Sequence, residues 1–300
     1  MTEMKLVKTF PGTQAEPSHL PLHRIQYEGV VRAALEEDLG RAGDLTTDGV
    51  VSSDSVATAS LAARSAGVVA GLDVAIAAFQ MLDENVRISV ERPDGAAVAA
   101  GSRLARVDGP ARAILTGERV ALNFLGRLCG VATATAGMVD AIQGHDAHII
   151  CTRKTTPGLR TLEKYAVRVG GGMNHRFGLD DAVLIKDNHV ALAGGVAEAV
   201  DRVRKRAGHM VKIQVEVDTL EQLDTLIPLG VDAVMLDNMD HATMRQAVNK
   251  VAGRMLVEAS GGITPETVAA VAATGVNLIS SGALTHSVKA LDIGLDIDIG

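Results

Sequence analysis

Two adjacent cations, Arg153 and Lys154, stand in the segment CTRKTTPGLR (residues 151–160), directly after an apolar run. Basic side chains dominate the following stretch, where a single acid, Glu163, is set against Arg153, Lys154, Arg160, Lys164, Arg168 and Arg176. The whole chain nevertheless carries a formal net charge of −7. A basic cluster in an acidic protein indicates a local site for an anion, because arginine and lysine donate several hydrogen bonds to carboxylates and phosphates.

Other apolar runs in the second half of the chain are also followed by polar or small residues. They lead to Lys186, Glu216, Asp237-Asn238, Ser260-Gly261-Gly262 and Ser281-Gly282-Ala283. In parallel α/β proteins the carboxyl ends of the strands form one face, and active sites are built on it. Any single strand ends in a polar loop, but basic groups, carboxylates and small-residue loops together predict a site for a charged ligand.

The carboxylates and glycines of this set leave more than one chemistry open. Glu216 and Asp237 could share a hydrated Mg²⁺, or they could pair with Lys154 and Lys186 in a charge network, and both can hold at once. The glycine pairs could let backbone N–H groups approach a phosphate, assisted by a helix that we expect to begin at Thr264. They could equally be ordinary turn glycines.

His175 follows three glycines and precedes Arg176. An isolated histidine is commonly a structural hydrogen-bonder, whereas one beside an arginine in a basic segment favours contact with an anionic ligand. We interpret His175 and Arg176 as ligand-binding residues.

The elements that must position these residues alternate between apolar strands and helix-like segments. The runs HIIC, AVLI, KIQVEV, DAVML, MLVEA and NLIS are continuous, which is typical of a parallel sheet buried on both faces. Six such strands, with a further candidate at Met173–Arg176, predict an open, incomplete (β/α) barrel. Only GLDD separates that candidate from the next strand, too short a link for a crossover helix.

The first part of the chain has a different pattern, with alternating strands and a Pro-Asp-Gly turn. We predict an N-terminal α+β sandwich domain over residues 1–130, joined by residues 287–300 as a returning strand, and a catalytic barrel over residues 131–286. A helix from Ala111 to about Gln143 should break near Gly126–Gly130. The first 20 or so residues should be poorly ordered.

Composition excludes several functional classes. With two Tyr, four Phe and no Trp, an acidic chain lacks the basic stripe or stacking surface of a nucleic-acid binder. No run approaches the ~18 uninterrupted apolar residues of a membrane span, and the N-terminal segment has no signal-peptide core, so we expect a cytoplasmic protein without membrane partners. Cys129 and Cys151 have no metal-site spacing and are expected to be buried thiols.

Several ordered motifs carry a family resemblance over nearly the whole chain. They are EEDLGRAGDLTT, LTGERVALNFLGRLCGVAT, CTRKTTPGLR, GGGMNHRFGLDDAVLIKDNH, VEVD, MLDN, EASGGI and SSGALTHS. The sequence resembles the quinolinate phosphoribosyltransferases, also called carboxylating nicotinate-nucleotide pyrophosphorylases. The resemblance implies a sandwich domain followed by an open barrel. It also implies a Mg²⁺-dependent pentosyltransferase of NAD biosynthesis that converts quinolinate and phosphoribosyl pyrophosphate into nicotinate mononucleotide, pyrophosphate and carbon dioxide.

The resemblance also implies a role for each matching residue. Quinolinate would contact Arg119, Thr152, Arg153, His175 and Arg176. Lys154 and Lys186 would contact the diphosphate and the substrate, while Glu216 and Asp237 would hold Mg²⁺ and the ribose. The 5-phosphate would lie against Ser260, Gly261, Gly262, Ser281, Gly282 and Ala283. Arg119 would reach the active site of a neighbouring subunit, which implies a homodimer or a larger assembly.

Three other functions are compatible with parts of the pattern. A related transferase could take nicotinate or another pyridine base without decarboxylation. A barrel lyase or aldolase could use Lys154 or Lys186 as a Schiff-base nucleophile. A protein that only binds sugar phosphates would need the anion site but no catalysis.

Overall fold

The computed structural model describes residues 20–298, so the expectation for the first 20 or so residues lies outside the described part. The chain forms two compact units. The barrel unit contains residues Gly137–Lys154 and Gly172–Ala283, and the sandwich unit contains residues 20–136, Thr155–Gly171 and residues 284–298. These ranges differ from the predicted division after residues 130 and 286, since the segment after Lys154 leaves the barrel unit and returns at Gly172.

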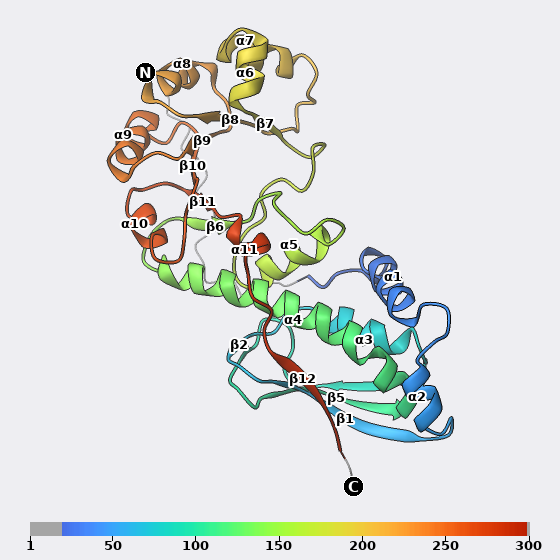
Figure 1. Cartoon of the computed structure of the whole chain (residues 1–300). Helices are drawn as coiled ribbons and strands as arrows, with labels where there is room; N and C mark the ends of the chain where they lie inside the picture. The colour runs from blue at the N-terminus through green and yellow to red at the C-terminus, as the bar shows by residue number, and fades with distance from the viewer. Residues whose placement is uncertain (1–19, 299–300) are drawn as a thin grey trace. The chain divides into compact units, whose positions relative to one another are not determined.

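Six parallel strands make up the sheet of the barrel unit (Figure 1). Their order across the sheet is β6-β11-β10-β9-β8-β7. Each predicted apolar run supplies one strand: β6 (His148–Ile150), β7 (Val183–Ile185), β8 (Ile213–Val217), β9 (Ala233–Asp237), β10 (Leu256–Ser260) and β11 (Leu278–Ser280). Together with the antiparallel sandwich unit, this parallel sheet confirms the predicted fold class.

Helices cover the convex side of the curved sheet (Figure 1). They are α6 (Asp187–Ala193), α7 (Val196–Arg204), α8 (Leu220–Leu226) with the 3-10 turn η2 (Ile227–Leu229), α9 (His241–Val251) and α10 (Val268–Ala272). The expected helix start at Thr264 is wrong. Thr264 accepts the backbone N–H of Val268 within a turn, and the helix begins only at Val268.

The segment expected as a seventh strand makes only a single parallel bridge, between Met173 and Ile150 of β6. After it, the short link to β7 is a tight turn in which Asp181 accepts the backbone N–H groups of Phe177 and Gly178, at 2.5 and 3.0 Å. The link holds no helix, as its length predicted. The ladder is therefore not continued from this segment to β7.

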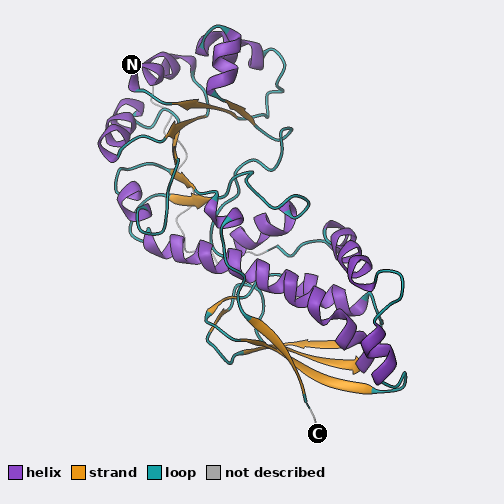
Figure 2. Cartoon of the chain, viewed as in Figure 1, coloured by secondary structure: helices purple, strands orange, loops and turns teal. Residues whose placement is uncertain are grey.

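The sandwich unit is built on an antiparallel sheet of order β12-β1-β5-β3 (Figure 2). Its strands are β1 (Val56–Ala63), β3 (Arg87–Val90), β5 (Arg103–Pro110) and β12 (Ile293–Ile297), with a small second sheet of β2 (Gly67–Val68) and β4 (Ala97–Val98). The alternating C-terminal segment forms β12, which pairs antiparallel with β1. The helices are η1 (Arg24–Gln26), α1 (Glu28–Leu39), α2 (Leu45–Val50), α3 (Leu72–Gln80), α4 (Ala111–Ala141), α5 (Arg160–Val169) and α11 (Ala283–His286).

Helix α4 runs without a break from Ala111 to Ala141, so the predicted interruption at Gly126–Gly130 is wrong. Both glycines instead admit a close backbone neighbour. A Cβ at Gly126 would lie 2.9 Å from the Leu291 carbonyl oxygen, and one at Gly130 would collide with that of Lys289. α4 is also long and apolar enough to span a bilayer by length and composition. However, 56% of its 18-residue apolar segment is buried within the protein, as in a core helix.

A buried ion pair fastens α5 to α4 within the sandwich unit. The Glu163 side chain is fully buried, and its Oε1 accepts from Arg127 Nη2 at 2.7 Å. The two oxygens of Glu163 also accept from the backbone N–H and hydroxyl of Thr156, at 3.0 and 2.7 Å. A buried carboxylate needs this set of donors, so α5 stays with the sandwich unit although the barrel follows it in sequence.

Cys129 and Cys151 are both buried and reduced, as predicted. Burial raises the pKa of Cys129 to about 12, since the thiolate would lose its hydration. This thiol therefore has no reactive anionic form at neutral pH.

Replacing Gly130 by alanine should destabilise the protein. The added methyl group meets the Lys289 backbone, so the cost should be about 1–3 kcal/mol, as for other overpacked sites. Gly137 is the matched control, because it lies in the same helix with open space around its Cβ position. Gly137→Ala should stabilise by about 0.5–1 kcal/mol through helix propensity. Urea unfolding of both variants measures the difference, and equal midpoints would contradict the close-approach interpretation.

Candidate active site

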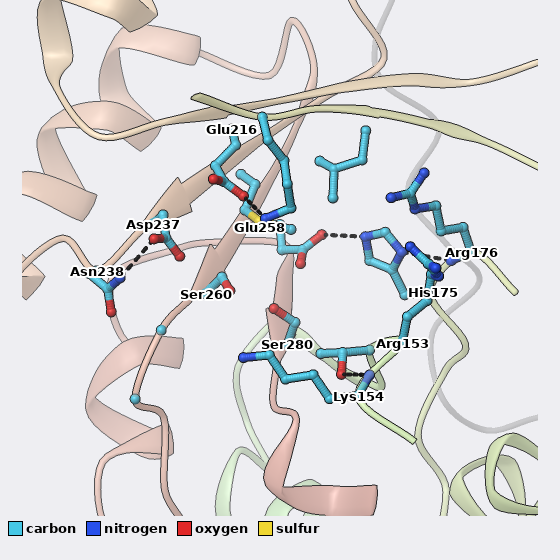
Figure 3. Close-up of a pocket in the computed structure, with 16 residues that line it drawn as sticks. Arg153, Lys154, His175, Arg176, Glu216, Asp237, Asn238, Glu258, Ser260 and Ser280 are labelled. Atoms are coloured by element: carbon cyan, nitrogen blue, oxygen red, sulfur yellow. Dashed lines mark hydrogen bonds and ion pairs between the residues drawn. The ribbon is translucent and has the colours of Figure 1, made fainter. Parts of the chain in front are cut away.

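A pocket of about 550 Å³ lies at the carboxyl ends of the barrel strands (Figure 3). Its lining follows the two-residue period of the strands, because alternate side chains of a barrel strand point inward. The outer layer contains Lys186, Glu216, Asp237 and Ser260, each at or next to the end of its strand. Two residues earlier stand Leu184, Met235 and Glu258, which also line the pocket.

Most of the predicted site residues meet in this one pocket. The loop after β6 supplies Thr152, Arg153 and Lys154, and the loop after β10 supplies Gly261 and Gly262. His175 and Arg176 come from the segment Met173–Arg176, which is joined to β6 by one bridge and is called the bridged segment below. Ser281, Gly282 and Ala283 are not among its lining residues. Ser281 is buried and its hydroxyl donates to the Ile263 carbonyl oxygen at 3.2 Å, while Ser280 faces the pocket in its place. Arg119 lies exposed on α4 and does not line this pocket.

The positive charge of Arg176 is disfavoured by its surroundings in the pocket. Burial lowers the pKa of Arg176, and the nearby positive charge of Arg153 lowers it further. The Arg153 Nε is buried without a hydrogen-bond partner. Arg176 donates through Nη1 to the Ala182 carbonyl oxygen at 3.2 Å. The unpaired Arg153 Nε and the disfavoured charge of Arg176 together favour the binding of an anion at this side.

Carboxylates occupy the opposite side of the pocket, on strands β8 and β9. Lys186 Nζ donates to Glu216 Oε2 at 2.6 Å, and Asn238 Nδ2 donates to Asp237 Oδ2 at 2.7 Å (Figure 3). Each carboxylate is thus held by one neighbour and keeps its remaining lone pairs for a ligand. Asn238 was not among the predicted site residues.

The loop after β10 has a left-handed backbone that favours glycine. Gly261 has φ +100° and Gly262 has φ +60°. A Cβ at Gly261 would collide with the side chain of Asn238, which itself adopts φ +52° and donates its backbone N–H to Ser260 at 3.0 Å. This packing brings the Gly261–Gly262 backbone to the pocket wall without a Cβ atom in the way.

His175 belongs to a side-chain network with Gln214 and Glu258, neither of which was predicted. His175 Nε2 lies 2.9 Å from Gln214 Oε1, and Gln214 Nε2 donates to Glu258 Oε2 at 2.6 Å. The same Glu258 oxygen is 3.5 Å from His175 Nε2 (Figure 3). A sequence signal existed, since Gln214 and Glu258 are polar residues inside apolar strands, two positions before Glu216 and Ser260.

Family models match most of the chain. The C-terminal domain of quinolinate phosphoribosyl transferase matches residues 131–296, and the N-terminal domain matches residues 44–129. The chain belongs to the quinolinate phosphoribosyltransferase family. The predicted family and enzyme class are thereby confirmed.

Individual relatives of the family agree over nearly full length. The chain is 45% identical over 278 residues to the probable nicotinate-nucleotide pyrophosphorylase (carboxylating) of Bacillus subtilis, covering 93% of this chain and 96% of the relative. It is 46% identical over 275 residues to the nicotinate-nucleotide pyrophosphorylase (carboxylating) of Mycobacterium leprae, covering 89% and 95%. NadC from Streptococcus pyogenes superposes with a TM-score of 0.89 at 40% identity, covering 93% and 99%.

The residues of this family member offer limited ligation for a metal. Among the described residues no group of three His, Cys, Asp or Glu side chains could hold an ion. Glu216 and Asp237 provide two carboxylates on paired strands. Mg²⁺ is commonly bound by one or two carboxylates and completed by water and substrate phosphate oxygens, so this donor set fits Mg²⁺ that arrives with a phosphorylated substrate.

The pocket should bind inorganic pyrophosphate, with Lys154 as one of its contacts. Lys154→Met should weaken this binding by about tenfold, the effect of losing one charged hydrogen bond. Lys205→Met is the matched control, because Lys205 is an exposed lysine of the same unit that pairs with Asp201 at 2.5 Å, away from the pocket. Calorimetric titration with pyrophosphate measures both affinities, and equal losses would remove the pocket as the anion site.

Proposed function

We propose that the protein transfers the phosphoribosyl group of phosphoribosyl pyrophosphate to quinolinate and decarboxylates the product to nicotinate mononucleotide. The observation that carries this proposal is the meeting, in one pocket, of the cations of the β6 loop and the bridged segment with the carboxylates of β8 and β9. Membership of the family supports the same reaction. The pocket thus has one side suited to an aromatic dicarboxylate and another suited to a sugar diphosphate.

Quinolinate would bind on the side of Arg153, His175 and Arg176. Its two carboxylates match the unpaired Arg153 Nε and the Arg176 guanidinium, whose positive charge is disfavoured by burial and by Arg153. Thr152 lines the same side, and Leu184 and Met235 provide apolar surface for the pyridine ring. Binding a dianion here offsets the repulsion between the two arginines.

Phosphoribosyl pyrophosphate would bind along the carboxyl ends of β7 to β10. The 5-phosphate would accept backbone N–H groups from Ser260–Gly262, and the diphosphate would accept from Lys154 and Lys186. Glu216 and Asp237 would hold the ribose and Mg²⁺, which when bound would neutralise part of the diphosphate charge. Lys186 would contact the diphosphate from the side of Glu216, with which it already pairs.

The reaction would proceed by displacement at the anomeric carbon. The pyridine nitrogen forms the new C–N bond while the C–O bond to pyrophosphate breaks, and the lysines stabilise the departing charge. Glu216 and Asp237 stabilise the positive charge that develops on the sugar. The ring nitrogen is then cationic, so when the neighbouring carboxylate leaves as CO₂, the adjacent ring carbon can keep the electron pair and take a proton from water.

A Schiff-base lyase is disfavoured by the surroundings of its candidate nucleophile. Lys186 is about half exposed and forms an ion pair with Glu216 at 2.6 Å. A nucleophilic lysine must be neutral, which desolvation or a nearby cation promotes and an adjacent carboxylate opposes. Lys154 is exposed as well, so neither lysine has the buried setting that this chemistry requires.

The active unit would be a homodimer in which Arg119 of one chain completes the pocket of its partner. Arg119 is exposed on α4, whereas most of the neighbouring positions of that helix are buried. An exposed arginine in a core helix is suited to contact a second copy of the chain, and twofold symmetry would then complete both pockets.

A product assay tests the reaction directly. Purified protein is incubated with phosphoribosyl pyrophosphate and Mg²⁺, with quinolinate or nicotinate supplied separately, and the products are resolved by mass. Nicotinate mononucleotide should form from quinolinate and not from nicotinate, because the arginine side fits two carboxylates. Product from nicotinate alone would indicate a transferase without decarboxylation, and product from neither would remove the proposal.

Subunit mixing tests the role of Arg119. Arg119→Ala and Lys154→Met proteins should each be strongly impaired, because each lacks a charged side chain that contacts a substrate. After mixing and exchange, random pairing should restore at most about a quarter of the wild-type activity, since one intact pocket forms in each mixed dimer. A mixture as inactive as its components would show that Arg119 does not act across chains.

A further inference from the structure

Glu258 is a buried carboxylate that forms no ion pair with a lysine or arginine among the described residues, and its potential cationic neighbour is the His175 ring at 3.5 Å. Glu258 lies on β10 with no exposed surface, and its Oε1 has no hydrogen bond. Among the described residues, Arg153 Nε is the only other buried side-chain N or O atom left without one. Burying an unpaired carboxylate oxygen is costly, and an apolar residue would fill this strand position more stably. Its presence at the pocket floor therefore indicates a role in the site.

The hydrogen bonds that start at Glu258 have fixed directions. A carboxylate can only accept, so Gln214 must turn its NH₂ group toward Glu258 Oε2 and its carbonyl oxygen toward His175. His175 must then carry its proton on Nε2 to donate to that oxygen. Its Nδ1 is left as an acceptor, and it accepts the Arg176 backbone N–H at 2.7 Å. The Glu258 carboxylate, which can only accept, and the Arg176 N–H, which can only donate, thus require the same tautomer from the two sides of the ring.

We propose that Glu258 is a positioning residue that sets the tautomer and ring orientation of His175 through Gln214. The three side chains come from three separate segments, β10, β8 and the bridged segment, so the network also fixes His175 relative to the sheet. Through the Nδ1 bond it holds the Arg176 backbone, whose guanidinium faces the same pocket. Carboxylates that orient a histidine through its ring N–H are a general device for fixing an imidazole.

The consequence for catalysis rests on the proposed function, in which His175 and Arg176 hold quinolinate. Loss of the orienting carboxylate should then weaken quinolinate binding and leave phosphoribosyl pyrophosphate binding nearly unchanged, because the latter lies along the other strand ends. A Glu258 that served only to stabilise the fold would affect both substrates alike.

An exchange of the two polar side chains tests the inference. Glu258→Gln removes the obligate acceptor, so the residue at 258 can offer either its oxygen or its NH₂ group, and Gln214 is free to flip. Gln214→Glu places two carboxylates side by side. The double variant Gln214→Glu/Glu258→Gln has the same atoms and charge as the wild type and again presents only an acceptor to His175. Asp232→Asn is the control for the loss of a hydrogen-bonded carboxylate in the same unit. Asp232 lies just before β9, at the amino ends of the strands, and accepts the Ile213 backbone N–H.

Two readouts are taken on the full-length protein. Nitrogen-15 NMR of the imidazole, assigned with a His175→Asn variant, should report the Nε2–H tautomer in the wild type, the double variant and Asp232→Asn, and a mixture in Glu258→Gln. The KM for quinolinate should rise about tenfold in Glu258→Gln, as expected for one lost charged hydrogen bond, and return to within a few-fold in the double variant.

An unchanged His175 tautomer in Glu258→Gln overturns the inference, and so does a double variant as impaired as the single ones. A tautomer change without a selective rise in the quinolinate KM overturns the link to substrate binding. If the wild type itself does not use quinolinate, the proposed function fails, while the NMR comparison still decides whether Glu258 sets the state of His175.

Discussion

Parallel pairing of the barrel strands is the constraint on which the pocket depends. Because β7, β8, β9 and β10 run in the same direction and pair in register, Ser260 lies beside Asp237, and Glu216 lies beside Met235. Residues scattered over more than a hundred positions of sequence thereby reach one edge of the sheet. The buried apolar side chains on both faces hold this register, since a one-residue slip would turn every inward side chain outward.

Charge in the pocket is balanced only in part. On the carboxylate side, Glu216 and Asp237 each accept a hydrogen bond from a neighbouring side chain before a ligand binds. On the arginine side, the lowered pKa of Arg176 and the unpaired Arg153 Nε reflect positive groups held close together away from water. Such an arrangement costs stability in the free protein. A dianionic ligand supplies the missing negative charge, so the fold is better suited to the occupied pocket than to the empty one.

Sequence reasoning succeeded where one strand end determined the outcome. Continuous apolar runs identified the six strands, and the residues after them predicted most of the pocket. It failed where a contact with a segment distant in sequence determined the local structure. Gly126 and Gly130 resemble helix breakers, yet they are required by the approach of residues 289–291, which no local pattern reveals. Ser281 was preferred to Ser280 because only the residues after each strand were considered, whereas Ser280, the last residue of β11, faces the pocket and the Ser281 hydroxyl donates to the Ile263 carbonyl oxygen instead. Glu258 and Gln214 were missed because their partner, His175, lies on a segment distant in sequence.

The barrel stays open between the segment at residues 173–176 and β7. A continuous strand at residues 173–176 would extend the ladder toward β7, but the link of a few residues is too short for a crossover, and the segment pairs only through Met173. Beyond that bridge, side chains replace the ladder: Arg176 donates to the Ala182 carbonyl oxygen, and His175 reaches Gln214 on β8. These side-chain hydrogen bonds connect the segment to its neighbours where a continuous barrel would have backbone pairing. The incomplete barrel is therefore what allows His175 and Arg176 to face a ligand, since in a closed ladder their backbone would be fixed by β7 and their side chains by the alternation of the strand.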